Sequence, residues 1–368
     1  MQNVKTLAIA LAAIGVAGAA QAQSNVTIYG RVNTSLEQTK IEGEDSVTKM
    51  INNSSRIGFR GNEDLGGGMS ALFQIESGFN SDAGGGNLAT RDTFVGLKSN
   101  LGTIKLGYIT SPLYYATHDY LGMSNHDTGT SSDAFLWLSA YDPEKFYLRN
   151  SITYASPTFG GGFVFEAQYS ALNEQATDSV ALNRSARPTH YSATVNYDNG
   201  PLHVGFGYAR TNKFYNFDEG KSKDSALTMA AVYDFKSFVI GGLFERNKSD
   251  NGGLQDISGL TGDHHRNHYR VSAMLPVGAN EFHVNYGVAR DWSSTNDTGA
   301  KQITLGYNYN LSKRTKVYAQ WTKIDNDKQK SSIDNGDAYN GGGAYSFLSG
   351  TGLGLDNTSF GVGLRHNF

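Results

Sequence analysis

The chain has 368 residues with 44 Gly, 21 Tyr and 19 Phe but 6 Pro and no Cys, and its formal net charge at pH 7 is −3. This balance gives no basic footprint for a nucleic-acid partner, and the missing cysteines exclude a disulfide framework. No second apolar run of about 18 residues follows the amino terminus, which excludes helical membrane spans.

Residues 1–22 have the pattern of a secretory signal peptide. A short polar start with Lys5 precedes an apolar run over 7–20, and the small residues Ala20 and Ala22 surround Gln21. Such a segment is removed during export. We therefore expect cleavage after Ala22 and a mature domain of residues 23–368.

The mature chain opens with period-2 alternation. Over 26–36 one face carries the apolar residues Val26, Ile28, Val32 and Leu36. The other face carries the polar residues Thr27, Tyr29, Arg31 and Asn33. After a polar segment, 54–61 repeats the device, with Arg56 and Arg60 opposite Ile57 and Phe59. Apolar residues on one face and polar residues on the other are typical of a membrane strand between lipid and a water-filled interior.

The alternation continues along the chain. The glycine-rich 62–68 predicts a turn, and further strands are expected at 69–76, 163–171, 189–198, 202–211, 267–275, 281–291 and 301–311. Some connections are short, namely 99–102, 156–161, 199–201, 276–280 and 312–314. Others are long and polar, namely 80–89, 173–187, 213–223, 249–266 and 326–354. Short turns on one rim and long loops on the other are typical of an outer-membrane barrel.

One stretch, 108–149, breaks this regularity. It has no sustained period, carries four acidic residues and is rich in aromatic residues such as Tyr114, Tyr115 and Trp137. A structureless insert of this length is usually functional or disordered, and this one is too apolar for a solvated linker. We interpret it as a loop packed inside a hollow barrel.

These segments predict an all-β fold, a transmembrane antiparallel β-barrel of roughly sixteen strands with an uncertainty of about two, wide enough for an aqueous channel. The last strand runs to the final residue, with Phe360, Val362, Leu364 and Phe368 on one face. It can therefore pair with the first strand and close the sheet.

Several motifs resemble the general porins of Gram-negative bacteria, especially the β-proteobacterial type. They are SSRIGFRGNEDLGGGM (54–69), TRDTFVGL (90–97), RNSITYASP (149–157) and VTIYGR (26–31). The resemblance implies a homotrimer in the outer membrane, in contact with outer-membrane lipid and lipopolysaccharide, that passes ions and small hydrophilic solutes by diffusion. It also implies that the third external loop folds inward and that Phe368 is an assembly signal.

The resemblance further implies a basic cluster on the barrel wall opposite acids on the inward loop. Arg31, Arg56 and Arg91 match the basic cluster by motif position, and the candidate loop acids are Asp119, Asp127, Asp133 and Asp142. The bland alternative is that these arginines are solvated lumen charges without a special role.

Two other functions stay open. A substrate-specific channel would carry a ladder of aromatics, for which Tyr114, Tyr115 and Tyr120 are candidates. An outer-membrane barrel enzyme would need catalytic residues, but no G-x-S-x-G, H-E-x-x-H or phosphate-loop motif is present. We expect no cofactor and no metal, and we place the histidine-rich 262–268 on a solvated external loop.

Overall fold

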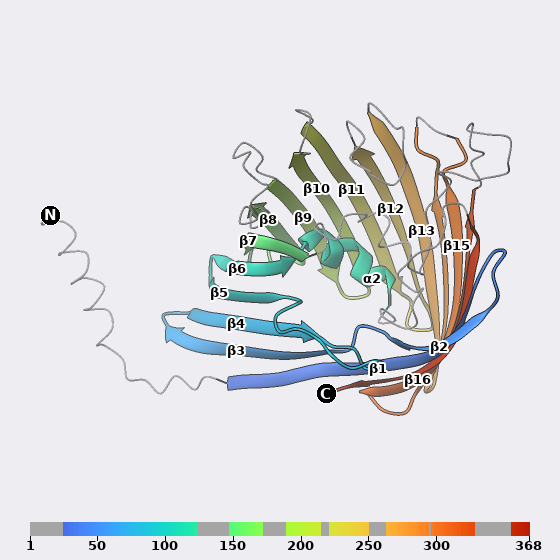
Figure 1. The fold of residues 1–368 in the computed structure, drawn as a ribbon. Coiled ribbons are helices and arrows are strands. Elements are labelled where there is room, and N and C mark those ends of the chain that lie inside the picture. Colours follow the sequence, from blue (N-terminus) through green and yellow to red (C-terminus); the bar gives the residue numbers. More distant parts are fainter. Residues whose placement is uncertain are drawn as a thin grey trace, which may run out of the picture.

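The computed structural model describes residues 25–123, 147–171, 189–214, 221–249, 263–293, 296–327 and 355–368, which form one antiparallel sheet curled into a barrel (Figure 1). Its strands are β1 (Asn25–Ile41), β2 (Val47–Asn52), β3 (Arg56–Gly66), β4 (Met69–Gly78), β5 (Thr93–Ser99), β6 (Gly102–Thr110), β7 (Tyr147–Ala155), β8 (Phe163–Ala171), β9 (Thr189–Asn199), β10 (Leu202–Phe214), β11 (Lys221–Asp234), β12 (Val239–Ser249), β13 (His264–Val277), β14 (Asn280–Ala289), β15 (Ala300–Asn310), β16 (Thr315–Asn326) and β17 (Asn357–Asn367).

The seventeen labelled segments make sixteen barrel strands. Both β2 and β3 pair with β1, since Thr34 is the partner of Asn52 and Arg31 is the partner of Arg56. The two segments therefore run end to end along β1, interrupted at 53–55, where Ser54 adopts φ 56°. The predicted strand number is confirmed.

The barrel is closed by its first and last strands. β1 pairs with β17 over eleven residues, from Arg31 with Asn367 to Ile41 with Asn357. Gly30 and Phe368 add two backbone hydrogen bonds of 3.0 Å each. Within the described residues, the sheet is therefore closed and has no edge strand that could pair with another chain, as the sequence predicts.

Side chains alternate between an apolar outer face and a polar inner face. On β1, Val26 and Ile28 are 59% and 60% exposed, whereas Asn33 on the inner face is 0% exposed. The same alternation continues on β10, where Val204, Phe206 and Tyr208 point outward and His203 points inward. This is the arrangement of a barrel with lipid outside and a polar interior.

The two rims differ as predicted. One rim has the short connections 67–68, 100–101, 156–162, 200–201, 235–238, 278–279 and 311–314, and the other has the longer ones. The predicted turn at 62–68 is shorter in the structure, because β3 continues to Gly66 and the chain reverses at Gly67 and Gly68.

One prediction made for the long-loop rim is wrong, since the segment 262–268, expected on a solvated external loop, contains the start of β13 at His264. The polar segment after residue 36, for which the sequence predicts no element, contains the upper part of β1 and all of β2. Strand ends that rise above the lipid band have polar residues on both faces, so the alternation that predicts a strand is lost there.

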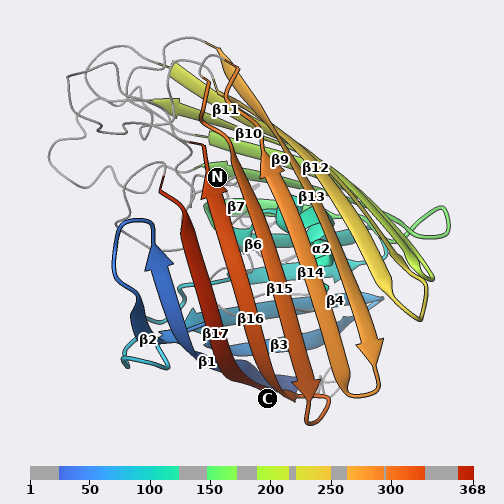
Figure 2. The ribbon, with the colours of Figure 1, turned by 90° about the vertical axis from the view of Figure 1, so that its right-hand side faces the viewer.

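After β6 the chain turns into the barrel. It forms a π-helical turn, η1 (Tyr114–His118), followed by α2 (Asp119–Leu121). In Figure 1 these turns lie in the concavity of the sheet, and in Figure 2 they lie behind the β13–β17 part of the wall. Within the described part of the chain, no helix is long and apolar enough to cross a membrane.

Candidate functional site

A row of basic side chains crosses the inner face of neighbouring strands. Arg31 on β1 is the register partner of Arg56 on β3, and Lys316 on β16 is the partner of Arg365 on β17. The Nε of Arg31 donates a hydrogen bond of 2.9 Å to Oδ1 of Asn367, which joins the two pairs across the barrel closure. We call Arg31, Arg56, Arg91, Lys316 and Arg365 the basic wall.

One carboxylate sits within the basic wall. Glu76 on the inner face of β4 pairs with Arg91, which precedes β5, and its Oε1 lies 3.9 Å from Nε of Arg56. The hydroxyl of Tyr29 donates a hydrogen bond of 2.9 Å to its Oε2. Glu76 therefore fixes the directions of both guanidinium groups and offsets part of their charge.

The inward loop is tied down where it leaves the wall. Asp92 accepts hydrogen bonds of 2.6 Å from the backbone N–H of Thr110 and 2.8 Å from its hydroxyl. Its other oxygen accepts a bond of 3.0 Å from the Tyr115 hydroxyl. A single side chain thus joins the start of β5, the end of β6 and the first turn of the loop.

The next contact of the loop is with β9 and β10. His203 lies between two acceptors, with Nε2 2.9 Å from the Ala116 carbonyl oxygen and Nδ1 2.7 Å from Asp198. Both bonds form together only when both ring nitrogens carry protons. The ring of Tyr120 stacks on His203, and its hydroxyl donates to Asp198 at 3.0 Å.

The Tyr120 hydroxyl stays protonated at physiological pH. Partial burial and then the hydrogen bond to Asp198 raise the pKa of Tyr120 to about 12. Its hydrogen bond to the Asp198 carboxylate is therefore present over the whole physiological pH range.

A buried polar pair anchors the loop on β12. Nε2 of His118 lies 3.0 Å from Oε2 of Glu245, and both side chains are almost completely buried. The hydroxyl of Thr228 on β11 donates to the same oxygen at 3.0 Å. A carboxylate removed from water in this way needs such partners, so the contact strongly favours one loop position.

The wall beneath the loop is unusually apolar for an inner face. Leu121 and Met123 of the loop pack on Ala230 and Val232 of β11 and on Leu243 of β12. This seat continues onto β10 at Gly205, where an added methyl group would overlap the carbonyl group of Ala116. The sequence therefore provides both an apolar surface for the loop side chains and the space that the loop backbone occupies.

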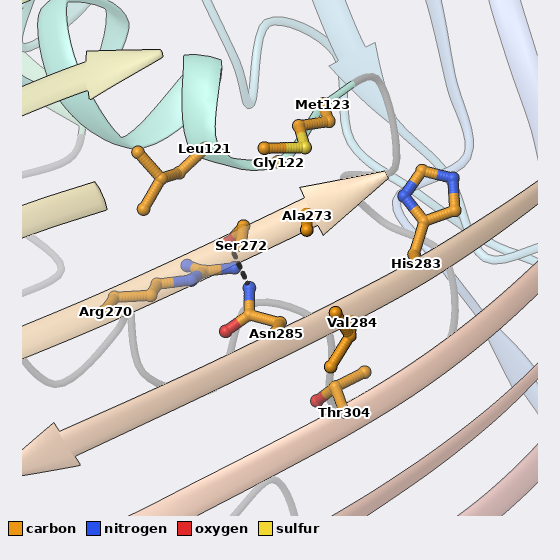
Figure 3. Close-up of a pocket in the computed structure, with 10 residues that line it drawn as sticks. All are labelled: Leu121, Gly122, Met123, Arg270, Ser272, Ala273, His283, Val284, Asn285 and Thr304. Atoms are coloured by element: carbon orange, nitrogen blue, oxygen red, sulfur yellow. Dashed lines mark hydrogen bonds between the residues drawn. The ribbon is translucent and has the colours of Figure 1, made fainter. Parts of the chain in front are cut away.

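The loop next reaches β13–β15. A small cavity of about 30 Å³, the size of one water molecule, separates Leu121, Gly122 and Met123 from the wall. The other side of the cavity is formed by side chains of β13, β14 and β15 (Figure 3). There the side-chain amide of Asn285 donates a hydrogen bond of 2.9 Å to the hydroxyl of Ser272. Residues 111–123 therefore follow the inner wall from β9 to β15.

The seat of the loop on β10–β12 and the arginines of the basic wall on and beside β1, β3 and β4 lie on opposite sides of the barrel. In the strand order, β1, β3 and β4 lie half a circumference away from β10, β11 and β12. Glu245 and Gly205 beneath the loop therefore face the side of Arg31 and Arg56 across the lumen. Such an arrangement can narrow the channel and give its two sides different charge.

Sequence comparison decides the family. The model of the Gram-negative porin family matches residues 7–329. The chain is also 32% identical to outer membrane porin protein 32 of Delftia acidovorans, over 99% of this chain and 100% of that protein.

The chain belongs to the Gram-negative porin family.

Other relatives and solved structures agree. Major outer membrane protein P.IB of Neisseria meningitidis is 27% identical, with 98% of both chains covered. The structure of an anion-selective porin from Comamonas acidovorans superimposes with a TM-score of 0.71 at 29% identity, covering 94% of this chain and 100% of that one. Salmonella typhi OmpF, at 17% identity and a TM-score of 0.64, supports the fold alone. This porin is thus a β-barrel of the Gram-negative outer membrane.

The predicted site residues of the porin have different positions. Arg31, Arg56 and Arg91 are brought together, and Asp119 lies exposed in α2 on the opposite side. The other three candidate acids, Asp127, Asp133 and Asp142, lie outside the described residues.

The sequence prediction missed Glu76, Lys316 and Arg365. Alternation along β4, β16 and β17 places each of these side chains on the inner face, which is a signal present in the sequence. Their height relative to Arg31 was the missing information, because it depends on the pairing register. Within the described residues, the acid that contacts Arg56 and Arg91 is Glu76 of the wall.

Proposed function

We propose that this porin is a passive diffusion channel for ions and small hydrophilic solutes, with a constriction between the basic wall and the inward loop. The observation that carries the proposal is the opposition of Arg31, Arg56 and Arg91 to the loop segment 111–123. Charges of opposite sign across a narrow aqueous passage create a transverse field that separates anion and cation paths. In this proposal the loop acids Asp119, Asp127, Asp133 and Asp142 supply the negative side.

We further propose that the channel prefers anions. Five basic side chains, four of them arginines, gather on the basic wall, and Glu76 offsets part of their charge. The anion-selective relative, at 29% identity over nearly the whole chain, supports the same sign.

Solute uptake into liposomes tests the channel directly. Vesicles that contain the purified protein should swell in small neutral sugars at a rate that falls steeply with solute size, and planar bilayers should show stepwise ohmic conductance. Neither result is expected of a barrel enzyme. A substrate-specific channel would instead show conductance blocked by one solute class at low concentration.

We propose that the chain acts as a channel and not as an enzyme. The family membership supports this, since the fold and the inner-wall residues described above account for a passage without a catalytic group. The aromatic residues Tyr115 and Tyr120 bond to Asp92 and Asp198 and hold the loop, which favours a structural role over a solute-binding ladder.

The distribution of exposed aromatic residues on the outer face also supports a homotrimer. On β1–β5, Phe73 is the single large exposed aromatic residue. By contrast, β7–β15 carry many exposed aromatic side chains: Tyr154, Phe163, Tyr169, Tyr191, Phe206, Tyr208, Tyr233, Tyr269, Phe282, Tyr286, Tyr307 and Tyr309. Aromatic girdles mark the surfaces that meet the lipid interface. We infer that β1–β5 face neighbouring subunits and that the rest of the barrel faces lipid.

Polar substitutions on the two arcs test this assembly. Replacing Ile28 and Val95 on the aromatic-poor arc by glutamine should convert folded trimers to monomers on native gels. The matched pair Val204→Gln and Val284→Gln, on the aromatic-rich arc, should leave the trimer intact. Equal loss in both variants would place the subunit contact elsewhere.

We also propose that residues 1–22 are removed during export and that Phe368 acts as an assembly signal. Amino-terminal sequencing of the outer-membrane protein should start at Gln23. Deleting Phe368 should lower the yield of folded protein, because the deletion also removes both backbone bonds to Gly30. Retention of Met1, or an unchanged yield, would contradict these two proposals.

A further inference from the structure

The inner wall carries apolar side chains between the basic wall and the short-turn rim. On β4, Leu72 lies between Glu76 and the short connection 67–68, and it shares the strand parity of Glu76, so it points into the lumen. Phe94 on β5 lies on the same face, since Gly96 is the register partner of Leu72. Both side chains are partly exposed. The lumen of such a barrel is otherwise polar, so these two residues form a distinct surface within it.

This surface is closely packed around Gly96. A methyl group added at Gly96 would lie 2.9 Å from Cδ1 of Leu72 and 3.3 Å from Cγ of Lys105 on β6. The two side chains therefore close over Gly96 from both neighbouring strands. The Lys105 ammonium group lies 4.9 Å from the centroid of the Phe94 ring, a cation–π contact that positions the charge without neutralising it.

A second lysine lies next to the first. Lys98 on β5 is the register partner of Thr103, which makes it the diagonal neighbour of Lys105 on the same face. Within the described residues, neither lysine forms an ion pair. We call Leu72, Phe94, Lys98 and Lys105 the Gly96 patch.

The surrounding charges leave the Gly96 patch positive. Between the basic wall and the short turns, the charges that the described parts of β3–β8 direct into the lumen are three cations and two acids: Arg60, Lys98, Lys105, Asp64 and Glu166. Arg60 and Asp64 lie on the same face of β3 and offset each other. Glu166 lies on β8, separated from β6 by β7, and forms no ion pair with Lys105.

The combination of groups favours one class of solute. Lysine ammonium groups are complementary to a carboxylate, and Leu72 and Phe94 are complementary to an apolar ring or chain. A chloride ion or a short polar anion makes only the first of these interactions. The side chains that provide them meet over Gly96, so one small molecule can make both.

We propose that the Gly96 patch is a binding site for organic monocarboxylates with an apolar body, on the short-turn side of the constriction. This inference rests on the proposed function, because a solute reaches the patch through the open channel. Transient binding there raises the concentration of these anions inside the lumen and so favours their passage over that of equally charged polar solutes.

Relative permeability tests the proposal. Reversal potentials are measured with sodium benzoate or sodium acetate on one side of a planar bilayer and sodium chloride on the other. Lys105→Met removes the ammonium group and keeps an apolar stem over Gly96, whereas Leu72→Asn keeps the size of the side chain and removes its apolar surface. The matched controls are Lys313→Gln and Leu101→Asn, which change exposed residues of the short turns.

Wild type and both controls should pass benzoate at least as readily as acetate, although benzoate is the bulkier ion. Leu72→Asn should lower the benzoate-to-acetate permeability ratio about fourfold, the effect of burying roughly one methylene group. Lys105→Met should lower the permeability of both carboxylates relative to sodium by up to about fivefold, as expected for a partly exposed ion pair.

A wild-type channel that passes acetate more readily than benzoate, or an unchanged ratio in Leu72→Asn, would overturn the proposal. So would an equal loss of carboxylate permeability in Lys105→Met and Lys313→Gln. A wild-type protein that conducts no ions would refute the channel and the Gly96 patch together, whereas a conducting channel without the preference for benzoate would refute the patch alone.

Discussion

The two opposite sides of the inner wall are built in different ways. On β1, β3, β16 and β17 the functional groups are long charged side chains that project from strands. On β10–β12 the wall has Gly205, Ala230 and Val232 and receives a loop instead. We propose from this comparison that rigid strands set the charge of the channel, whereas the seating of the loop sets its width.

The strongest way to disturb the loop side is to break its buried pair. His118→Ala removes one hydrogen-bond partner of the buried Glu245 carboxylate and leaves it bonded to the hydroxyl of Thr228 on β11. Removing one partner of a buried charged pair costs about 3–5 kcal/mol. We expect the loop to leave its seat, with larger and noisier single-channel conductance.

The control for that variant is Glu245→Leu combined with His118→Leu. Replacing both partners by apolar residues leaves no unpaired charge, so the loop should remain nearer its seat than in His118→Ala. Identical channel records for wild type and His118→Ala would contradict the anchoring role of this pair.

A smaller disturbance fills the space under the loop backbone. Gly205→Ala places a methyl group against the Ala116 carbonyl, and overpacking of this kind costs about 1–3 kcal/mol. We expect an intermediate rise in conductance with the barrel itself unchanged. Gly242→Ala is the matched control, since its added methyl group would meet the Arg270 carbonyl oxygen at an ordinary 3.8 Å. A rise of equal size in both variants would show that the effect does not come from the loop seat.

The substitution Glu76→Gln tests how the charge of the basic wall affects ion selectivity. This change keeps the size of the side chain but removes the negative charge that meets Arg56 and Arg91. We expect the reversal potential under a salt gradient to move toward anions, with conductance little changed. A shift toward cations would mean that the substitution displaces the arginines, and Glu76→Asp would then restore the wild-type value.

Much of the fold follows from the sequence, because lipid outside and water inside force a period-2 pattern on every strand. Val26 and Ile28 are exposed and Asn33 is buried, as that pattern predicts. The pattern fails above the lipid band, where β2 mixes polar and apolar residues on both faces and the start of β13 is polar. Strand limits there depend on pairing, which a single segment does not encode.

The site was predicted less completely for a related reason. Alternation shows that Arg31, Glu76 and Arg365 face inward, but their height in the barrel follows from the register between strands. The loop seat could not be predicted for the same reason. The role of Gly205, Ala230 and Val232 becomes visible only when β10 and β11 are placed beside residues 113–123. Motif resemblance assigns Arg31, Arg56 and Arg91 to the basic cluster, whereas periodicity shows only which face of a strand a side chain occupies.

The central claim is that the basic wall determines which ions pass. Its most direct test is the reversal potential of the triple variant Arg31→Ser, Arg56→Ser and Arg91→Ser under a salt gradient. We predict a shift toward cations that is larger at low salt than at about 1 M, because the screening length falls to about 3 Å at the higher concentration. A reversal potential equal to that of wild type at low salt, with the trimer intact, would show that these arginines do not line the constriction.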